Sequence, residues 1–166
     1  MSKGRRATPA RGLRSPVPSS KTAPKRPLDS QRIAAEIVAA LADAVIVTGP
    51  DRRALTANRA AADLFGRPLE DLPGTPIDDL VAPGERANVA EHEQLAFQGE
   101  EQHYETKVVS ASGEERVVAV STTPLVVEGE LIGAVATLRD ITEQKQAEET
   151  LTRSEARYRH LFESAS

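Results

Sequence analysis

The sequence has no cysteine and no tryptophan, and only 3% of its 166 residues are aromatic. Without cysteine there are no disulfides, no thiolate metal ligands and no cysteine nucleophile. A core built by this chain therefore consists mainly of Ala, Val, Leu and Ile. No stretch approaches the roughly 18 uninterrupted apolar residues of a membrane span, and no signal peptide is recognisable, so we expect a cytoplasmic protein.

Acidic residues are missing from the N-terminal segment. Residues 1–28 hold eight Lys and Arg and no acid, whereas the rest of the chain holds 13 basic and 25 acidic side chains. This segment also contains five of the eleven prolines and few apolar residues, so it is predicted to be disordered. A cationic arm can bind nucleic acid, although this one lacks interleaved aromatic residues for base stacking, and a solvated extension is the simpler interpretation.

From about residue 30 the chain alternates between helical and strand patterns. Helices are predicted where apolar residues recur every three or four positions, at 31–42, 58–65, 67–72, 77–81 and 83–98. Strands are predicted from β-branched alternation at 44–48, 54–57, 102–110, 115–127 and 131–138. Hairpin-connected strands with helices between them indicate an α+β domain with a five-stranded antiparallel sheet. Helices over one face would leave a cavity, which is the default ligand site.

Three residues mark the predicted ends of helices. Asn58 is a suitable N-cap for the Ala-rich helix that follows it, and Gly66 a suitable stop. Asp140 fits the N-cap of a C-terminal helix, and Glu143 stands at the position that completes a capping box.

The ordered set of these segments resembles the PAS domain family. The segment LADAVIVTGPDRRALTANRAAADLFG (41–66) is similar to the family's opening hairpin, asparagine and first inner helix. FQGE (97–100) looks like the end of its long helix, and residues 110–148 resemble its C-terminal PAC motif. Ser112-Gly113 stands where Asp-Gly is more common. SEARYRHLFESAS (154–166) resembles the start of a second PAS domain.

The resemblance implies a PAS fold over residues 31–142, flanked by an N-terminal helix and by a signalling helix or linker at 143–166. It implies a non-enzymatic sensory and dimerisation module of a signal-transduction protein, such as a histidine-kinase two-component system. The expected partners are a second copy through the flanking helices, an unknown small-molecule ligand, and a downstream effector or kinase not present in this chain. The alternative is a nucleic-acid-associated adaptor that uses the basic tail.

Cofactors are tested against the residue types that the family uses. A photoreactive flavin site needs a cysteine, and flavin-binding relatives of the redox type often use a tryptophan beside the ring. The sequence has neither residue, so neither type of flavin site is expected here. The family's haem-ligating position falls on Asn88; His92, one turn later, is a substitute ligand, although a hydrogen-bonded helix histidine is the simpler interpretation. His92 and His160 lack the sequence context of a phosphoacceptor, and a lone strand histidine such as His103 is usually structural. No cofactor, metal site or catalytic residue is predicted.

Three groups of functional residues are predicted. The proposed cavity lining consists of Val45, Val47, Leu55, Phe65, Ile77, Leu80, Val89, Val118, Val120, Thr122, Ala134, Ala136 and Leu138. Core packing explains most of them equally well, and a shift of one residue would exchange the two faces of a strand. The signal relay is assigned to Arg139, Asp140, Ile141 and Thr142, and the helix–helix contact of a dimer to Leu151, Tyr158 and Phe162.

Overall fold

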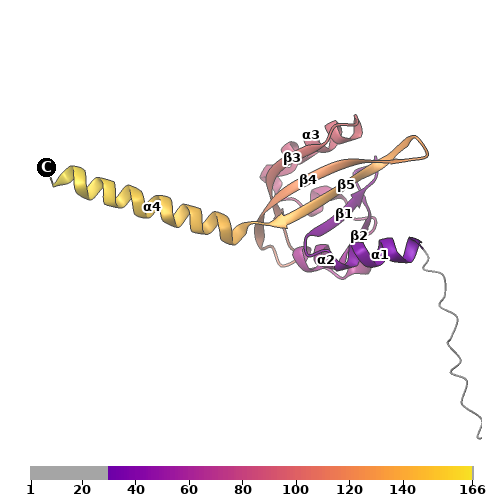
Figure 1. Cartoon of the computed structure of the whole chain (residues 1–166), viewed down its shortest axis with the longest axis horizontal. Coiled ribbons are helices and arrows are strands. Elements are labelled where there is room, and N and C mark those ends of the chain that lie inside the picture. Colours follow the sequence, from indigo (N-terminus) through magenta and orange to yellow (C-terminus); the bar gives the residue numbers. More distant parts are fainter. Residues whose placement is uncertain (1–29, 166) are drawn as a thin grey trace, which may run out of the picture.

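Five strands form one antiparallel sheet, as predicted (Figure 1). They are β1 (Ala44–Thr48), β2 (Ala54–Ala57), β3 (Gln102–Val109), β4 (Glu115–Val127) and β5 (Glu130–Asp140). The spatial order is β2-β1-β5-β4-β3, so the last strand lies at the centre. The computed structural model describes residues 30–165. The predicted disordered segment 1–28, with its suggested nucleic-acid contact, lies outside the described residues.

Helices pack on one face of this sheet and extend beyond it at both ends. They are α1 (Ser30–Ala40), α2 (Arg59–Phe65), α3 (Arg86–Phe97) and α4 (Thr142–Ser164), with 3₁₀ turns η1 (Leu69–Asp71), η2 (Ile77–Asp79) and η3 (Pro83–Glu85). Helix α2 contacts β1, and α3 contacts β3, β4 and β5. Helix α4 projects away from the domain (Figure 1). This arrangement is α+β, with the inner helices over one sheet face.

Three local predictions need correction. The short helix predicted at 77–81 is a single 3₁₀ turn, because only a few residues separate Pro76 from the next chain reversal. The short helical turn predicted at 67–72 is confirmed as η1. The expected long helix at 83–98 begins as the 3₁₀ turn η3 and becomes α-helical at Arg86. Helix α4 begins at Thr142, with Ile141 at the N-cap position, so Asp140 lies one residue too early for a capping box.

The core lies between the sheet and the inner helices. Its largest fully buried side chains are Phe65, Leu72, Leu80 and Val118. On α2 the alanines Ala61 and Ala62 are buried beside Phe65, so the helix backbone can approach the strands closely. In a chain so poor in aromatic residues, this close approach replaces the volume that larger rings would fill.

Asn58 joins three elements through its side chain. Its Oδ1 accepts hydrogen bonds from the backbone N–H of Val45 at 2.9 Å and of Ala61 at 3.0 Å. Its Nδ2 donates to the carbonyls of Val38 at 3.1 Å and Asp43 at 3.0 Å. The predicted N-cap of α2 is therefore confirmed, and the same amide also ties α2 to β1 and to the end of α1.

The predicted C-cap of α2 is confirmed as well. Gly66 has a φ of 59°, in the left-handed region, and its N–H returns to the carbonyls of the last helical turn. A left-handed residue at this position commonly ends a helix.

Gly133 of β5 lies against the backbone of β1. A Cβ at this position would stand 2.3 Å from the carbonyl oxygen of Thr48. The two atoms would clash at this distance, because it is shorter than their van der Waals contact. The two strands pair directly here, since Thr48 stands opposite Ala134. The close approach therefore requires glycine and holds the two central strands in register.

We predict that Gly133→Ala lowers the free energy of unfolding by about 1–3 kcal/mol, the usual cost of overpacking. The measurement is denaturant unfolding followed by circular dichroism. Gly84→Ala is the matched control, because a Cβ there meets no atom within 4 Å. Equal stabilities of the two variants would contradict the close approach.

Candidate ligand cavity and signalling junction

A cavity of about 40 Å³ lies between the sheet and the inner helices. At about 10–15 Å³ for each water, it holds about three water molecules, far less than the roughly 300–1,000 Å³ of pockets for larger ligands. Its wall is mostly apolar, and Glu93, Tyr104 and Thr122 lie close together as its polar end. Predicted residues found in the wall are Phe65, Ile77, Leu80, Val89, Val120, Thr122, Ala136 and Leu138.

The predicted face of β1 is wrong by one residue. Ile46 and Thr48 line the cavity, whereas Val45 and Val47 alternate onto the opposite face. Apolar residues occupy both faces of this strand, so hydrophobicity alone does not set its phase. The hydrogen bond from the Val45 N–H to Asn58 also fixes this strand relative to α2.

Three other predicted lining residues lie elsewhere. Leu55 is 50% exposed on the edge strand β2, because the buried residue of that strand is Ala54. Val118 and Ala134 are fully buried but pack outside the cavity wall. Ala134 instead pairs with Thr48, whose Oγ1 lies 3.5 Å from its carbonyl oxygen.

Of the polar residues in the cavity wall, only Thr122 was predicted. Glu93 of α3 is only 5% exposed and lies in the wall with Tyr104, Thr106 and Thr122. The buried residues of α3 are Val89, which was predicted to line the cavity, Glu93 and Ala96. The spacing of these three could have indicated the inward face, had Glu93 not been a charged residue.

A turn residue neutralises part of this buried charge. The Nε of Arg52, in the turn between β1 and β2, donates to Glu93 Oε2 at 2.6 Å, and its Nη2 lies 2.8 Å from Asp78 Oδ1. Arg52 has a φ of 59°, in the left-handed region that costs energy for a residue with a side chain. Its carbonyl accepts from the Ile77 N–H at 3.0 Å. Arg52 therefore links this turn to η2 and α3.

Burial raises the pKa of two side chains at the polar end, Glu93 and Tyr104. Desolvation raises the pKa of Glu93, and the ion pair with Arg52 offsets this only in part. Desolvation outweighs the ion pair because the Glu93 side chain is far more buried than that of Arg52. Burial and the nearby Glu93 charge raise the pKa of Tyr104 to about 12, so this phenol stays neutral at physiological pH.

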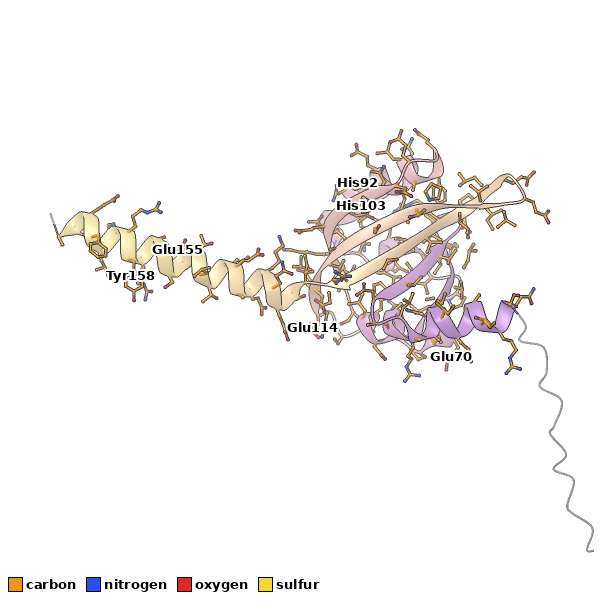
Figure 2. The ribbon with its side chains drawn as sticks, in the orientation of Figure 1. Glu70, His92, His103, Glu114, Glu155 and Tyr158 are labelled. Carbon is orange, nitrogen blue, oxygen red and sulfur yellow. The ribbon has the colours of Figure 1, made fainter. Side chains whose placement is uncertain are left out.

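His92 does not point into the cavity. Its ring stacks on Tyr104 with a centroid distance of 3.9 Å, and its Nδ1 lies 3.0 Å from Gln102 Oε1. Figure 2 shows its position beside the sheet edge, near His103. His92 is absent from the wall and the cavity is small, so haem and flavin do not fit the site. Among residues 30–165 no cluster of three or more His, Asp or Glu could hold a metal.

At the far end of the sheet, Asp140 connects β5 to α4. Its Oδ1 accepts from the N–H of Thr142 at 3.0 Å and from the Thr142 hydroxyl at 2.6 Å, and its Oδ2 accepts from Arg116 at 2.9 Å. Burial opposes ionisation, but these bonds outweigh it and lower the pKa of Asp140. The junction is thus held by a charged acceptor.

The rest of the junction is attached to β4. Thr142 Oγ1 also accepts from the Val117 N–H at 3.0 Å, and the Ile141 N–H donates to the Val117 carbonyl at 2.9 Å. Ile141 is buried, whereas Arg139 is exposed and pairs with Asp43 at 3.0 Å. The four predicted relay residues therefore contact β4 or the segment before β1.

The flanking helices expose apolar side chains. All residues of α1 and α4 belong to the described part of the chain, and none of them is buried. On α4 the exposed large apolar residues are Leu151, Tyr158, Leu161 and Phe162, the last 77% exposed. Tyr158 stands far from the domain, near the C-terminal end of α4 (Figure 2). No helix within residues 30–165 is long and apolar enough to cross a bilayer.

A family model described as PAS fold matches residues 38–146 of this sequence. The chain belongs to the PAS fold family. The matched range begins in α1 and ends in the first turn of α4, so it contains the cavity and the Asp140 junction. Comparison with curated proteins gave no significant match.

Solved structures show the same PAS fold. A PAS domain from Colwellia psychrerythraea is 24% identical with a TM-score of 0.63, covering 69% of this chain and 99% of that one. A sensory box histidine kinase/response regulator from Burkholderia thailandensis E264 is 20% identical, with a TM-score of 0.58 and coverages of 80% and 99%. The PAS domain of a LuxR-family transcriptional regulator from Burkholderia thailandensis, solved with ethanol, is 18% identical, with a TM-score of 0.55 and coverages of 64% and 96%.

The raised pKa of Glu93 makes the stability of this PAS domain pH-dependent. The folded state holds the Glu93 proton more tightly than the unfolded state. This group therefore stabilises the fold fully below its unfolded pKa of about 4.3. The stabilisation is lost as the pH rises through the folded pKa. We predict that the stability of the natural protein relative to Glu93→Gln falls over this range.

The measurement is urea unfolding at a series of pH values from acid to neutral. Glu91→Gln is the matched control, because it removes an exposed carboxylate from the same helix. If Glu93→Gln and Glu91→Gln show the same pH dependence, the Glu93 carboxyl is not desolvated as described.

Proposed function

We propose that this chain is a non-enzymatic sensory and dimerisation module that relays occupancy of its cavity through α4 to an effector. One observation carries the proposal: the strands that line the cavity also hold the start of α4. On β5, Leu138 lies in the cavity wall and Asp140 follows two residues later. On β4, Val120 lies in the wall and Val117 bonds the first residues of α4.

The mechanism follows from this shared construction. A ligand that binds one arrangement of the cavity wall better than another shifts the population toward that arrangement. Any displacement of β4 relative to β5 moves Arg116 and Val117 relative to Asp140, and these are the groups that orient Thr142. The direction of α4 then depends on the state of the cavity.

The size of the cavity favours a small ligand. A volume of about 40 Å³ suits a molecule of a few non-hydrogen atoms. The Burkholderia thailandensis regulator domain, which has the same fold, was solved with ethanol. We infer that a small, mostly apolar molecule is the signal that this chain detects.

The exposed residues of α4 support a homodimer. Leu151, Tyr158 and Leu161 are spaced by seven and three residues, the a–a–d pattern of a coiled coil, and Phe162 extends this apolar stripe. An isolated helix with this many polar residues is marginal in water, so packing against a second copy would stabilise it. Sensor kinases and regulators of this fold suggest the kind of effector that lies downstream.

We predict that Asp140→Ala lowers the free energy of unfolding by about 1 kcal/mol, since it removes partly exposed bonds to a charged acceptor. It should also increase hydrogen exchange in the first turns of α4. Asp63→Ala is the control, because Asp63 is an exposed carboxylate that pairs with Arg59 within α2. If stability and exchange are unchanged in Asp140→Ala, the relay through this residue is refuted.

We predict that the double variant Leu151→Glu, Leu161→Glu is monomeric at concentrations where the natural chain is dimeric, because like charges would face each other across the seam. Sedimentation equilibrium measures the mass of each. Ala156→Glu introduces the same charge on the opposite side of α4 and should leave the dimer intact. A natural chain that is monomeric throughout would disprove the dimer.

A further inference from the structure

Among residues 30–165, Glu93 is the one carboxylate in the cavity wall. Arg52 donates to Oε2, and within residues 30–165 no donor is seen at Oε1. Burying a carboxylate is costly unless its acceptor sites are used. An unused acceptor at the end of an apolar cavity is therefore a site for a molecule that supplies a donor.

The charges around the polar end favour donors as well. Arg52 is shared between Glu93 and Asp78, so this group of three carries a net negative charge. The wall groups beside Glu93 are neutral: the phenol of Tyr104 and the hydroxyl of Thr122. The other polar wall residues, Thr48 and Thr106, are neutral as well. An anion would face the buried Glu93 charge without a free cation on its side of the wall. A cationic or neutral donor would meet an acceptor.

The rest of the cavity sets the shape of the ligand. Beyond the polar end, the wall is formed by Phe65, Leu80, Val89 and Leu138, which offer no hydrogen bonds from their side chains. The volume of about 40 Å³ restricts the apolar part to about two or three carbons. The partner of Glu93 is thus the head of a short aliphatic chain.

We propose that Glu93 selects short aliphatic molecules whose polar head is a hydrogen-bond donor, either an alcohol or a protonated primary amine. This inference rests on the proposed function, because it takes the same cavity as the sensory site, and it adds the chemical class of the signal. The ligand donates to Oε1 of Glu93 while Arg52 keeps Oε2. Molecules of the same size that only accept hydrogen bonds, or that carry negative charge, are rejected.

The test uses the full chain with labelled methyl groups and titrates four probes at pH 7 by NMR. The donors are 1-propanol and propylammonium; acetone and propionate are the comparison probes without a suitable donor. We expect the donors to shift the Val89 and Leu138 methyl signals in a saturable way, with an affinity about tenfold above that of acetone and with no binding of propionate. Comparing 1-propanol with propylammonium shows which donor is preferred.

Variants separate this inference from the proposed function. Glu93→Gln keeps an acceptor oxygen but loses the negative charge, so it should remove most of the preference of about tenfold for propylammonium, whereas the exposed Glu91→Gln should keep it. Ala136→Val, which fills the cavity, should abolish binding of every probe. If acetone or propionate binds the natural chain as well as the donors do, or if Glu93→Gln keeps the preference, the role of Glu93 is overturned while the cavity stands as a ligand site. If no probe binds, both this inference and the ligand role of the cavity are overturned.

Discussion

The side-chain amide of Asn58 is the contact on which the inner part of the domain depends. It uses two donors and an acceptor in four hydrogen bonds to the backbone, with 3% of its surface exposed. Because each partner belongs to a different segment, the amide sets the distance of α2 from β1 and the path of the chain entering β1. Buried polar groups that lose a partner cost about 1–3 kcal/mol each, so few other side chains could replace it. The cavity exists in the space that this spacing leaves under α2 and η2.

The cavity combines two kinds of wall that act differently. Apolar side chains supply affinity that depends on size, but a methylene more or less changes such binding only modestly. Buried polar groups discriminate far more strongly, because a wrong ligand leaves them unpaired. Glu93 places one such group on α3, and Arg52 makes its burial tolerable from the turn between β1 and β2. The proposed ligand site and the packing of η2 therefore share the same ion pairs.

The central strand β5 links this site to the end of the domain. Its residues pair with β1 on one side and with β4 on the other, so in the proposed relay this strand would connect the cavity wall to Asp140. The close approach at Gly133 limits sliding of β5 against β1, whereas β4 holds the start of α4 through Val117. In the proposed relay, movement between β4 and β5 is therefore the motion that changes the direction of α4.

Local sequence determined the elements of this PAS fold. The five strands, the N-cap Asn58 and the C-cap Gly66 follow from alternation and capping, which involve residues within a few positions of each other. The same local patterns predicted most cavity residues on β4 and on the inner helices, because those segments have one apolar face. They failed on β1, where Val45, Ile46 and Val47 make both faces apolar, and only contacts with α2 and β5 decide the phase.

Glu93 illustrates what tertiary structure alone decided. A charged residue in a helix is expected on the solvent side, since burial of its carboxylate is costly. Arg52 offsets that cost, but it lies 41 residues away, in a turn with a left-handed backbone conformation. No local pattern joins these two residues. The sequence by itself determined which segments are strands and helices, whereas the polar end of the cavity arose from a long-range ion pair that only the folded chain brings together.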